Sequence, residues 1–137
     1  MHFEFVDRVL EVSPERIVTI KNVAASEEYL EDHFPTFPVL PGVFMIESMV
    51  QAGRRLLVER DASARRHVLG SVRALKYGAF VRPGDSMRVE VTVHKAGAGG
   101  EVEFRGSASV LRAGEGGGAD APTCVSGRFT LRPVRAG

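Results

Sequence analysis

Residues 33–53 read HFPTFPVLPGVFMIESMVQAG, a proline-rich loop that leads directly into an apolar segment. Pro35, Pro38 and Pro41 exclude regular structure before residue 41, because each proline fixes φ and lacks an amide hydrogen. Pro41 itself suits the first turn of a helix, where the missing hydrogen would have no intrahelical partner. The sequence therefore predicts one long helix from Gly42 to about Arg60, with a length of about 27 Å.

The predicted helix is apolar on nearly all sides in its first half and amphipathic in its second half. Its apolar residues form one stripe, which further apolar residues widen. The stripe contains Val43, Ile46, Val50, Gly53 and Leu57, and it is widened by Phe44, Met45, Met49 and Leu56. We expect other elements to cover most sides of the first half of this helix.

Segments with the composition or the two-residue alternation of β-strands lie on both sides of the helix. Strands are predicted at residues 16–23, 67–77, 86–95, 101–110 and 124–131. Met87, Val89, Val91 and Val93 share one face of one strand, and Val102, Phe104, Gly106, Ala108 and Val110 share one face of the next. Turns are expected at 13–15, 82–85 and 97–100, a short helix at 26–32, and a hairpin tip at 113–121. An antiparallel sheet that curls around the helix is the economical solution, so residues 1–137 are expected to form one α+β domain.

The composition excludes several classes of function. Lys and Arg total 18 and Asp and Glu total 17, which leaves a charge of +1 and gives no reason to expect nucleic acid or an anionic membrane as partner. The one cysteine, Cys124, is interpreted as a small core residue of a strand. We expect a cytoplasmic protein, since the chain shows no membrane span and no signal peptide. No metal is expected, because no cluster has the spacing of metal ligands.

Glu47 lies in the middle of the apolar segment, where a carboxylate is costly unless it is paired, hydrogen-bonded or neutral. At helical spacing its neighbours are Val43, Phe44, Val50 and Gln51, of which only Gln51 is polar. In one interpretation Glu47 emerges at a seam and is solvated. In the other it is a carboxyl group with a raised pKa that transfers protons near neutral pH.

Two further features of this stretch suit acid–base chemistry. His33 is held by the adjoining Phe34 and Pro35, and its loop returns the chain to the start of the helix that carries Glu47. Gly42 and Val43 open the helix, so their amide groups lack intrahelical partners and favour negative charge. Such amides suit an oxyanion or enolate that forms during a reaction.

The stretch resembles the signature of the hot-dog-fold 3-hydroxyacyl-[acyl-carrier-protein] dehydratases, in the branch that carries Glu on the helix and only dehydrates. The resemblance extends to residues 6–9 near the start and to residues 82–85 before the most regular predicted strand. Thr36 departs from the family pattern, which has glycine after His-Phe-Pro. The matching residues are His33, Phe34, Pro35, Pro41, Gly42, Glu47 and Gln51.

The resemblance implies a hot-dog fold and the β-elimination of water from a (3R)-3-hydroxyacyl thioester, without metal or redox cofactor. It implies that His33 removes the C2 proton, that the amide near Gly42 holds the thioester oxygen, that Glu47 helps the C3 hydroxyl leave, and that Gln51 has a positioning role. An apolar tunnel would take the acyl chain, with Met45, Met49 and Phe80 as wall residues.

The resemblance also implies partners. Acyl carrier protein would deliver the substrate, and the protein would be at least a homodimer, with trimers of dimers known in the family. Because acyl carrier proteins are acidic, basic residues are candidates for a docking surface. These are Arg54, Arg55, Arg65, Arg66, Arg73, Lys76 and Arg82.

Two other functions remain open at this point. A hot-dog thioesterase would hydrolyse the acyl thioester with the helix carboxylate as base, although the His-Phe-Pro start argues against it. A non-catalytic acyl-binding or scaffold subunit would have no need of both His33 and Glu47, although Thr36 leaves room for it.

Overall fold

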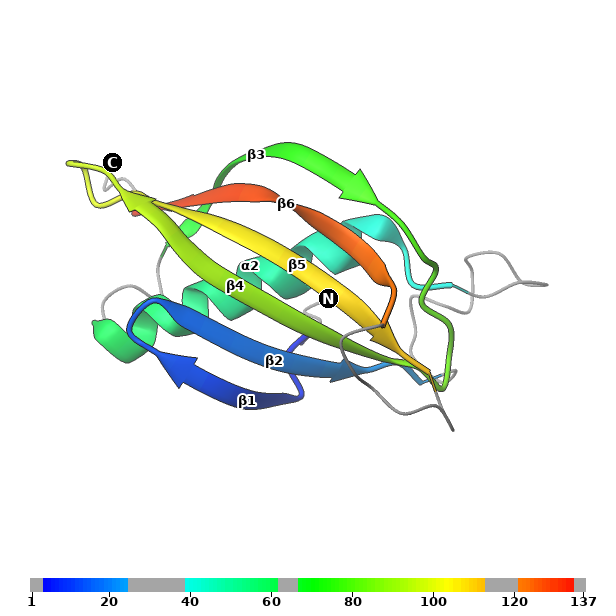
Figure 1. Ribbon diagram of the computed structural model, residues 1–137. Coiled ribbons are helices and arrows are strands. Elements are labelled where there is room, and N and C mark those ends of the chain that lie inside the picture. Colours follow the sequence, from blue (N-terminus) through cyan, green and yellow to red (C-terminus); the bar gives the residue numbers. More distant parts are fainter. Residues whose placement is uncertain (1–3, 25–38, 62–66, 113–120, 135–137) are drawn as a thin grey trace.

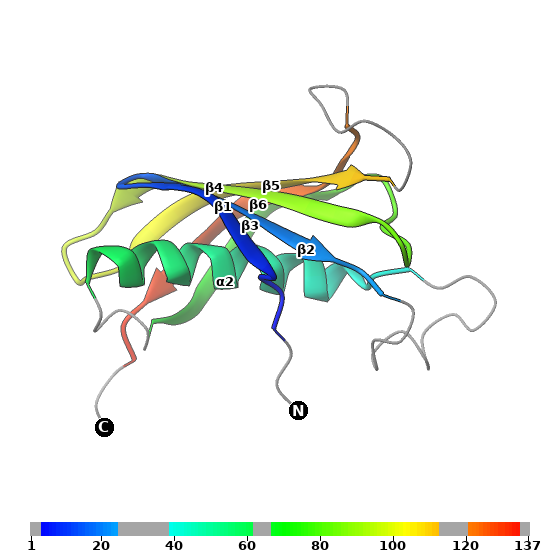
Figure 2. The ribbon, with the colours of Figure 1, turned by 90° about the horizontal axis from the view of Figure 1, so that it is seen from below.

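The computed structural model describes residues 4–24, 39–61, 67–112 and 121–134. Its elements are β1 (Arg8–Ser13), β2 (Arg16–Asn22), α2 (Gly42–Arg60), β3 (Val68–Tyr77), β4 (Ser86–Ala96), β5 (Val102–Leu111) and β6 (Thr123–Arg132). The strands form one six-stranded antiparallel sheet in the order β1-β2-β4-β5-β6-β3. The sheet curls around α2, which lies along one of its faces (Figures 1 and 2). The α+β architecture and the helix bounds predicted from the sequence are therefore confirmed.

The turn at residues 82–85 illustrates why the strands begin where they do. Gly84 has a φ of 94°, a conformation that side chains disfavour, and the amide of Asp85 donates to the carbonyl oxygen of Arg82 at 3.0 Å. The Asp85 carboxylate accepts the amide of Arg82 at 2.9 Å and a guanidinium hydrogen of Arg112 at 2.9 Å. These bonds close the turn and start β4 at Ser86, as the sequence predicted.

The inner face of the sheet is the one that the alternation predicted. Val89 and Val91 of β4 and Phe104 of β5 are fully buried, and Phe104 stacks on Phe129 of β6 at 5.2 Å between ring centroids. Gly53 of α2 lies over this ring pair, since a Cβ there would be 3.0 Å from Phe129. The core therefore lies between α2 and the central strands.

The buried side of α2 agrees with most of the predicted stripe and departs from it at the start of the helix. The predicted residues that are buried are Met45, Met49, Val50, Gly53, Leu56 and Leu57. The centre of this side is formed by Met45, Met49, Ala52 and Leu56, whereas Val43 is 64% exposed. The reason is geometric, because a sheet on one side of the helix covers only the residues that face it. Ile46 and Phe44 are half-buried for the same reason.

The outer face of the sheet carries ion pairs between neighbouring strands. Arg16 of β2 pairs with Glu11 at 2.7 Å and with Glu90 at 3.0 Å. The hydrogen bond from Arg16 lowers the pKa of Glu90, and partial burial of Glu90 opposes this effect. The predicted helix at 26–32 lies outside the described residues, as does most of the hairpin tip at 113–121. Within the described ranges no helix is long and apolar enough to span a membrane.

Candidate active site

A cavity of about 400 Å³ lies at the start of helix α2. Four of the residues that the sequence analysis assigned to substrate binding line it, namely Gly42, Val43, Met45 and Phe80. Tyr77 at the end of β3 and the two residues after it, Gly78 and Ala79, form another part of the wall. Leu40, which precedes Pro41, and Cys124 of β6 complete it. Residues distant in the sequence thus meet where the helix begins.

The amino end of α2 borders this cavity. Pro41 caps the helix with an extended backbone and no side-chain hydrogen bond, and its carbonyl oxygen accepts the amides of Phe44 at 3.0 Å and Met45 at 3.4 Å. The amides of Gly42 and Val43 therefore precede the first bonds of the helix. Their partial positive charge, added to that of the helix dipole, favours an anion or a polarised carbonyl oxygen at this end.

Glycine at position 42 allows a close approach by a tyrosine ring. A Cβ at this position would lie 2.7 Å from two carbon atoms of the Tyr77 ring and 2.8 Å from its hydroxyl oxygen. Tyr77 ends β3 and is 52% exposed. These distances place its ring directly over the start of the helix. No pattern in the sequence predicts this contact, because Tyr77 and Gly42 are 35 positions apart.

Backbone hydrogen bonds hold the cavity wall. The amide of Leu40 donates to the Val81 carbonyl oxygen at 2.8 Å, and the amide of Gly78 donates to that of Cys124 at 2.9 Å. Burial raises the pKa of the Cys124 thiol to about 11, and Sγ donates to the Ala108 carbonyl oxygen at 3.4 Å. Cys124 is fully buried, which confirms that it is a core residue.

Glu47 lies one helical turn beyond Val43, on the same side of α2. It is half-buried, and its Oε1 accepts a hydrogen bond from Gln51 Nε2 at 3.2 Å. Gln51 Oε1 in turn accepts the amide of Phe5 at 2.7 Å. Gln51, the one polar neighbour of Glu47 at helical spacing, is therefore hydrogen-bonded to it, and the contact with Phe5 is one that sequence reasoning missed.

Other candidates lie apart from the cavity or outside the description. Met49 is 1% exposed and packs in the core against Gly106 rather than on the cavity wall. His33 lies outside the described residues, as do Arg65 and Arg66. Arg54 donates to the His67 carbonyl oxygen at 2.9 Å, and Arg73 pairs with Glu103. Arg55, Lys76 and Arg82 are exposed.

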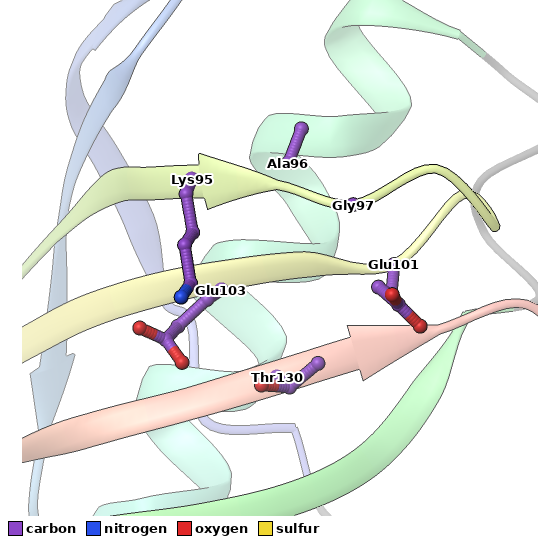
Figure 3. A pocket seen from close by; sticks show the side chains of 6 residues that line it. All are labelled: Lys95, Ala96, Gly97, Glu101, Glu103 and Thr130. Atoms are coloured by element: carbon purple, nitrogen blue, oxygen red, sulfur yellow. The ribbon is translucent and has the colours of Figure 1, made fainter.

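A second, smaller cavity of about 190 Å³ lies on the outer face of the sheet, away from helix α2 (Figure 3). Glu103 of β5 lines it and is 7% exposed, although it points away from the core. Burial would raise the pKa of Glu103, but the hydrogen bond and charge of Arg73 outweigh it and lower that pKa. The signal in the sequence that could have indicated this site is the alternation of Glu103 and Arg105, which are successive outward residues of one strand.

Arginines are concentrated beside Glu103. Arg105, Arg128 and Arg73 are directly opposed on β5, β6 and β3. Desolvation lowers the pKa of His94 on β4, and the positive charge of Arg105 lowers it further. Among the described residues no three His, Cys, Asp or Glu side chains are grouped to hold a metal.

An antiparallel sheet curled around one long helix, with a cavity at the amino end of that helix, defines a hot-dog protein. The FabA-like domain family matches residues 1–114, and the chain belongs to this family. It is similar to the 3-hydroxyacyl-[acyl-carrier-protein] dehydratase FabZ of Oenococcus oeni, with 46% identity over 92 residues that cover 66% of each chain. Identity to FabZ of Ruminiclostridium cellulolyticum is 36% over 99 residues, covering 69% of this chain and 70% of the relative. The chain thus spans about two thirds of the length of these curated relatives.

Solved structures share the fold at low sequence identity. The dehydratase heterocomplex ApeI:P from Xenorhabdus doucetiae superposes with a TM-score of 0.65 and 17% identity, covering 93% of this chain and 96% of the other. The Thermus thermophilus protein TTHA0967, a thioesterase superfamily member, gives a TM-score of 0.64 and 18% identity, covering 90% and 84%. At these identities the likeness concerns the fold alone.

Proposed function

We propose that this protein is a 3-hydroxyacyl-[acyl-carrier-protein] dehydratase. It converts a (3R)-3-hydroxyacyl thioester on acyl carrier protein into the trans-2-enoyl thioester, in fatty acid or related acyl-chain biosynthesis. The observation that carries the proposal is the arrangement on helix α2, where an amino end that favours negative charge borders a largely apolar cavity and Glu47 lies one turn further along. Membership of the FabA-like family supports it.

The reaction breaks the C2–H and C3–O bonds, forms the C2=C3 double bond and releases water. His33 takes the C2 proton, in the role that its motif implies. The Gly42 amide holds the thioester oxygen while negative charge accumulates on it, and Glu47 supplies the proton with which the C3 hydroxyl leaves as water. Positioned proton transfer typically contributes about 10²–10⁴-fold to the rate, and one oxyanion donor about 10²–10³-fold.

The acyl chain enters the cavity in this proposal. Met45 and Phe80 line it, and Val43 lies at its rim. Phe80 is 57% exposed and Val43 is 64% exposed, so both are accessible to a ligand or to a second copy of the chain. Met49 lies one turn beyond Met45 on the same helix and is buried in the core.

We further propose that the chain is one domain, residues 1–137, that acts in the cytoplasm as a homodimer or a trimer of dimers. Strand β3 supports the dimer, because it is ten residues long and lies at the edge of the sheet with Leu69 and Tyr77 exposed. An edge of this kind favours pairing with another strand. Acyl carrier protein is the proposed partner because the curated relatives carry it in their names.

Absorbance of the 2-enoyl thioester tests the activity. Purified protein should interconvert 3-hydroxyacyl and 2-enoyl thioesters of acyl carrier protein, and it should leave a saturated acyl thioester intact, unlike a thioesterase. His33→Ala and Glu47→Gln should each lower turnover at least about 100-fold, while the protein stays folded. Glu59→Gln is the matched control, since Glu59 is an exposed carboxylate near the far end of the same helix. Turnover at the wild-type rate in either site variant would contradict the assignment.

A further inference from the structure

The segment Phe5–Asp7, which precedes β1, is attached directly to helix α2. We call it the N-terminal strap. The amide of Phe5 donates to Gln51 Oε1 at 2.7 Å, and the carbonyl oxygen of Phe5 accepts the hydroxyl of Ser48 at 2.8 Å. The Phe5 side chain is 1% exposed and stacks on Phe44 at 5.2 Å. One residue of the strap is thus held to the helix by two hydrogen bonds and a buried ring.

Strand β2 holds the other side of the strap. The amide of Asp7 donates to the Ile20 carbonyl oxygen at 2.9 Å, and the Asp7 carboxylate accepts the amide of Asn22 at 2.6 Å. The ammonium group of Lys21 lies 3.7 Å from the Asp7 carboxylate and 5.7 Å from the centre of the Phe5 ring. Lys21 is buried, although lysine is rarely buried without partners. The strap is therefore fixed between β2 and α2, and so is the direction of the Phe5 amide.

The fixed amide decides which end of the Gln51 side chain faces Glu47. A backbone N–H only donates, so it requires the oxygen end of the carboxamide. The nitrogen end then faces the other way, and Nε2 donates to Glu47 Oε1 at 3.2 Å. A reversed carboxamide would place its oxygen against the Glu47 carboxylate and its NH₂ group against the Phe5 N–H, so neither hydrogen bond could form. A carboxylate beside a donor is held in place, whereas one beside a second acceptor is repelled.

We propose that the N-terminal strap is a positioning device for Glu47, acting through Gln51. The Phe5 amide orients the Gln51 carboxamide, the carboxamide holds Oε1 of Glu47, and the other carboxylate oxygen is left to serve the substrate hydroxyl. Phe5 and Gln51 are positioning residues that do not touch the reacting atoms. The inference rests on the proposed dehydratase function and adds to it a role for residues far from the motif.

Two substitutions at position 5 isolate the amide. Phe5→Pro removes both the ring and the N–H, whereas Phe5→Ala removes the ring and keeps the N–H. We expect kcat of Phe5→Pro to lie about 10-fold below that of Phe5→Ala, the size expected for one hydrogen bond that acts on a charged group. KM should agree within about threefold, because substrate binding is not altered. Equal kcat values in the two variants would overturn the proposal.

A double variant tests the route through Gln51. Gln51→Leu removes the carboxamide through which the Phe5 amide acts. In this background, the variants with Phe5→Pro and with Phe5→Ala should therefore have the same kcat. A full additional loss of about 10-fold would show that the strap acts by another route. If Phe5→Pro does not fold, Ser48→Ala releases the other anchor of the strap. It should lower kcat with KM unchanged, and an unchanged kcat would count against the proposal.

Nuclear magnetic resonance separates this proposal from the proposed activity. The chain contains one glutamine, Gln51, and one asparagine, Asn22, so ¹⁵N-labelled protein shows two side-chain carboxamide signals. In Phe5→Pro the Gln51 signal should move toward that of a solvated glutamine, whereas in Phe5→Ala it should stay near its wild-type position. An inactive wild-type protein with this response would refute the dehydratase assignment and leave the strap intact. A Gln51 signal that is the same in both variants would refute the strap, whatever the activity.

Discussion

Replacing Gly106 with alanine tests how helix α2 is seated on strand β5. A Cβ at position 106 would lie 2.7 Å from the sulfur of Met49 and 3.2 Å from Cε1 of Phe129. Ordinary contacts between such atoms are about 3.5–4.0 Å. Met49 and Phe129 are each 1% exposed, so the sulfur would have to retreat by about 1 Å into a filled core.

The size of the effect follows from two opposing contributions. Overpacking a filled core typically costs about 1–3 kcal/mol. Removing a glycine from the interior of a strand returns about 0.5–1 kcal/mol, because the unfolded chain loses freedom. We therefore expect Gly106→Ala to lower the free energy of unfolding by about 1–2 kcal/mol and Tm by about 3–8 °C.

Urea unfolding of four proteins measures this contact. Wild type, Gly106→Ala, Met49→Leu and the double variant form a cycle, in which Met49→Leu alone should cost less than about 1.5 kcal/mol. Leucine is shorter than methionine, so the cost of Gly106→Ala should fall by about 1 kcal/mol in the Met49→Leu background. Gly99→Ala is the control, since a Cβ there meets its nearest atom at 3.9 Å. Undiminished stability of Gly106→Ala, or additive losses in the double variant, would refute this account of the packing.

Three further predictions concern single residues. Gly78→Ala should destabilise the protein by more than about 3 kcal/mol in urea unfolding, because the added Cβ would overlap the backbone carbonyl oxygen of Thr123, which cannot move aside. A variant as stable as wild type would contradict the close approach. Cys124 should react with a thiol reagent only as the protein unfolds, since it is fully buried and burial raises its pKa to about 11; rapid stoichiometric labelling of native protein would contradict this. Glu103→Gln should lower Tm at pH 7, because it removes the partner of Arg73, and the difference from wild type should shrink below pH about 4.3. Folding lowers the pKa of Glu103, so its stabilising effect is present above the pKa of the unfolded chain and is lost as pH falls. A difference in Tm that stays constant with pH would count against this prediction.

Local rules predicted the elements that depend on neighbouring residues. Pro41 and the apolar segment after it predicted a helix that begins at Gly42, and the structure confirms this. The turn at 82–85 needed only a proline, a glycine and the capping carboxylate of Asp85. The inward alternation of β4 and β5 was also correct, because side chains alternate along a strand whatever its partners.

The exposure of a side chain depended on elements distant in the sequence. Val43 belongs to the apolar stripe and is nevertheless 64% exposed, because the sheet covers one side of the helix. Glu103 occupies an outward position on β5 and is nevertheless buried, and Arg73 of β3 reaches it across β6. Neither outcome follows from the periodicity of one segment.

The candidate site divides in the same way. The sequence alone singled out the candidate residues, since Glu47, Gln51 and Gly42 stand out within one stretch. The tertiary structure decided what surrounds them, namely Tyr77 over Gly42 and Phe5 beside Gln51. The physical reason is that helix starts, turns and alternation arise from bonds and sterics between near neighbours. A cavity wall or a fixed carboxamide instead requires atoms that are distant in the chain, and only the packing of the whole sheet on its helix brings them together.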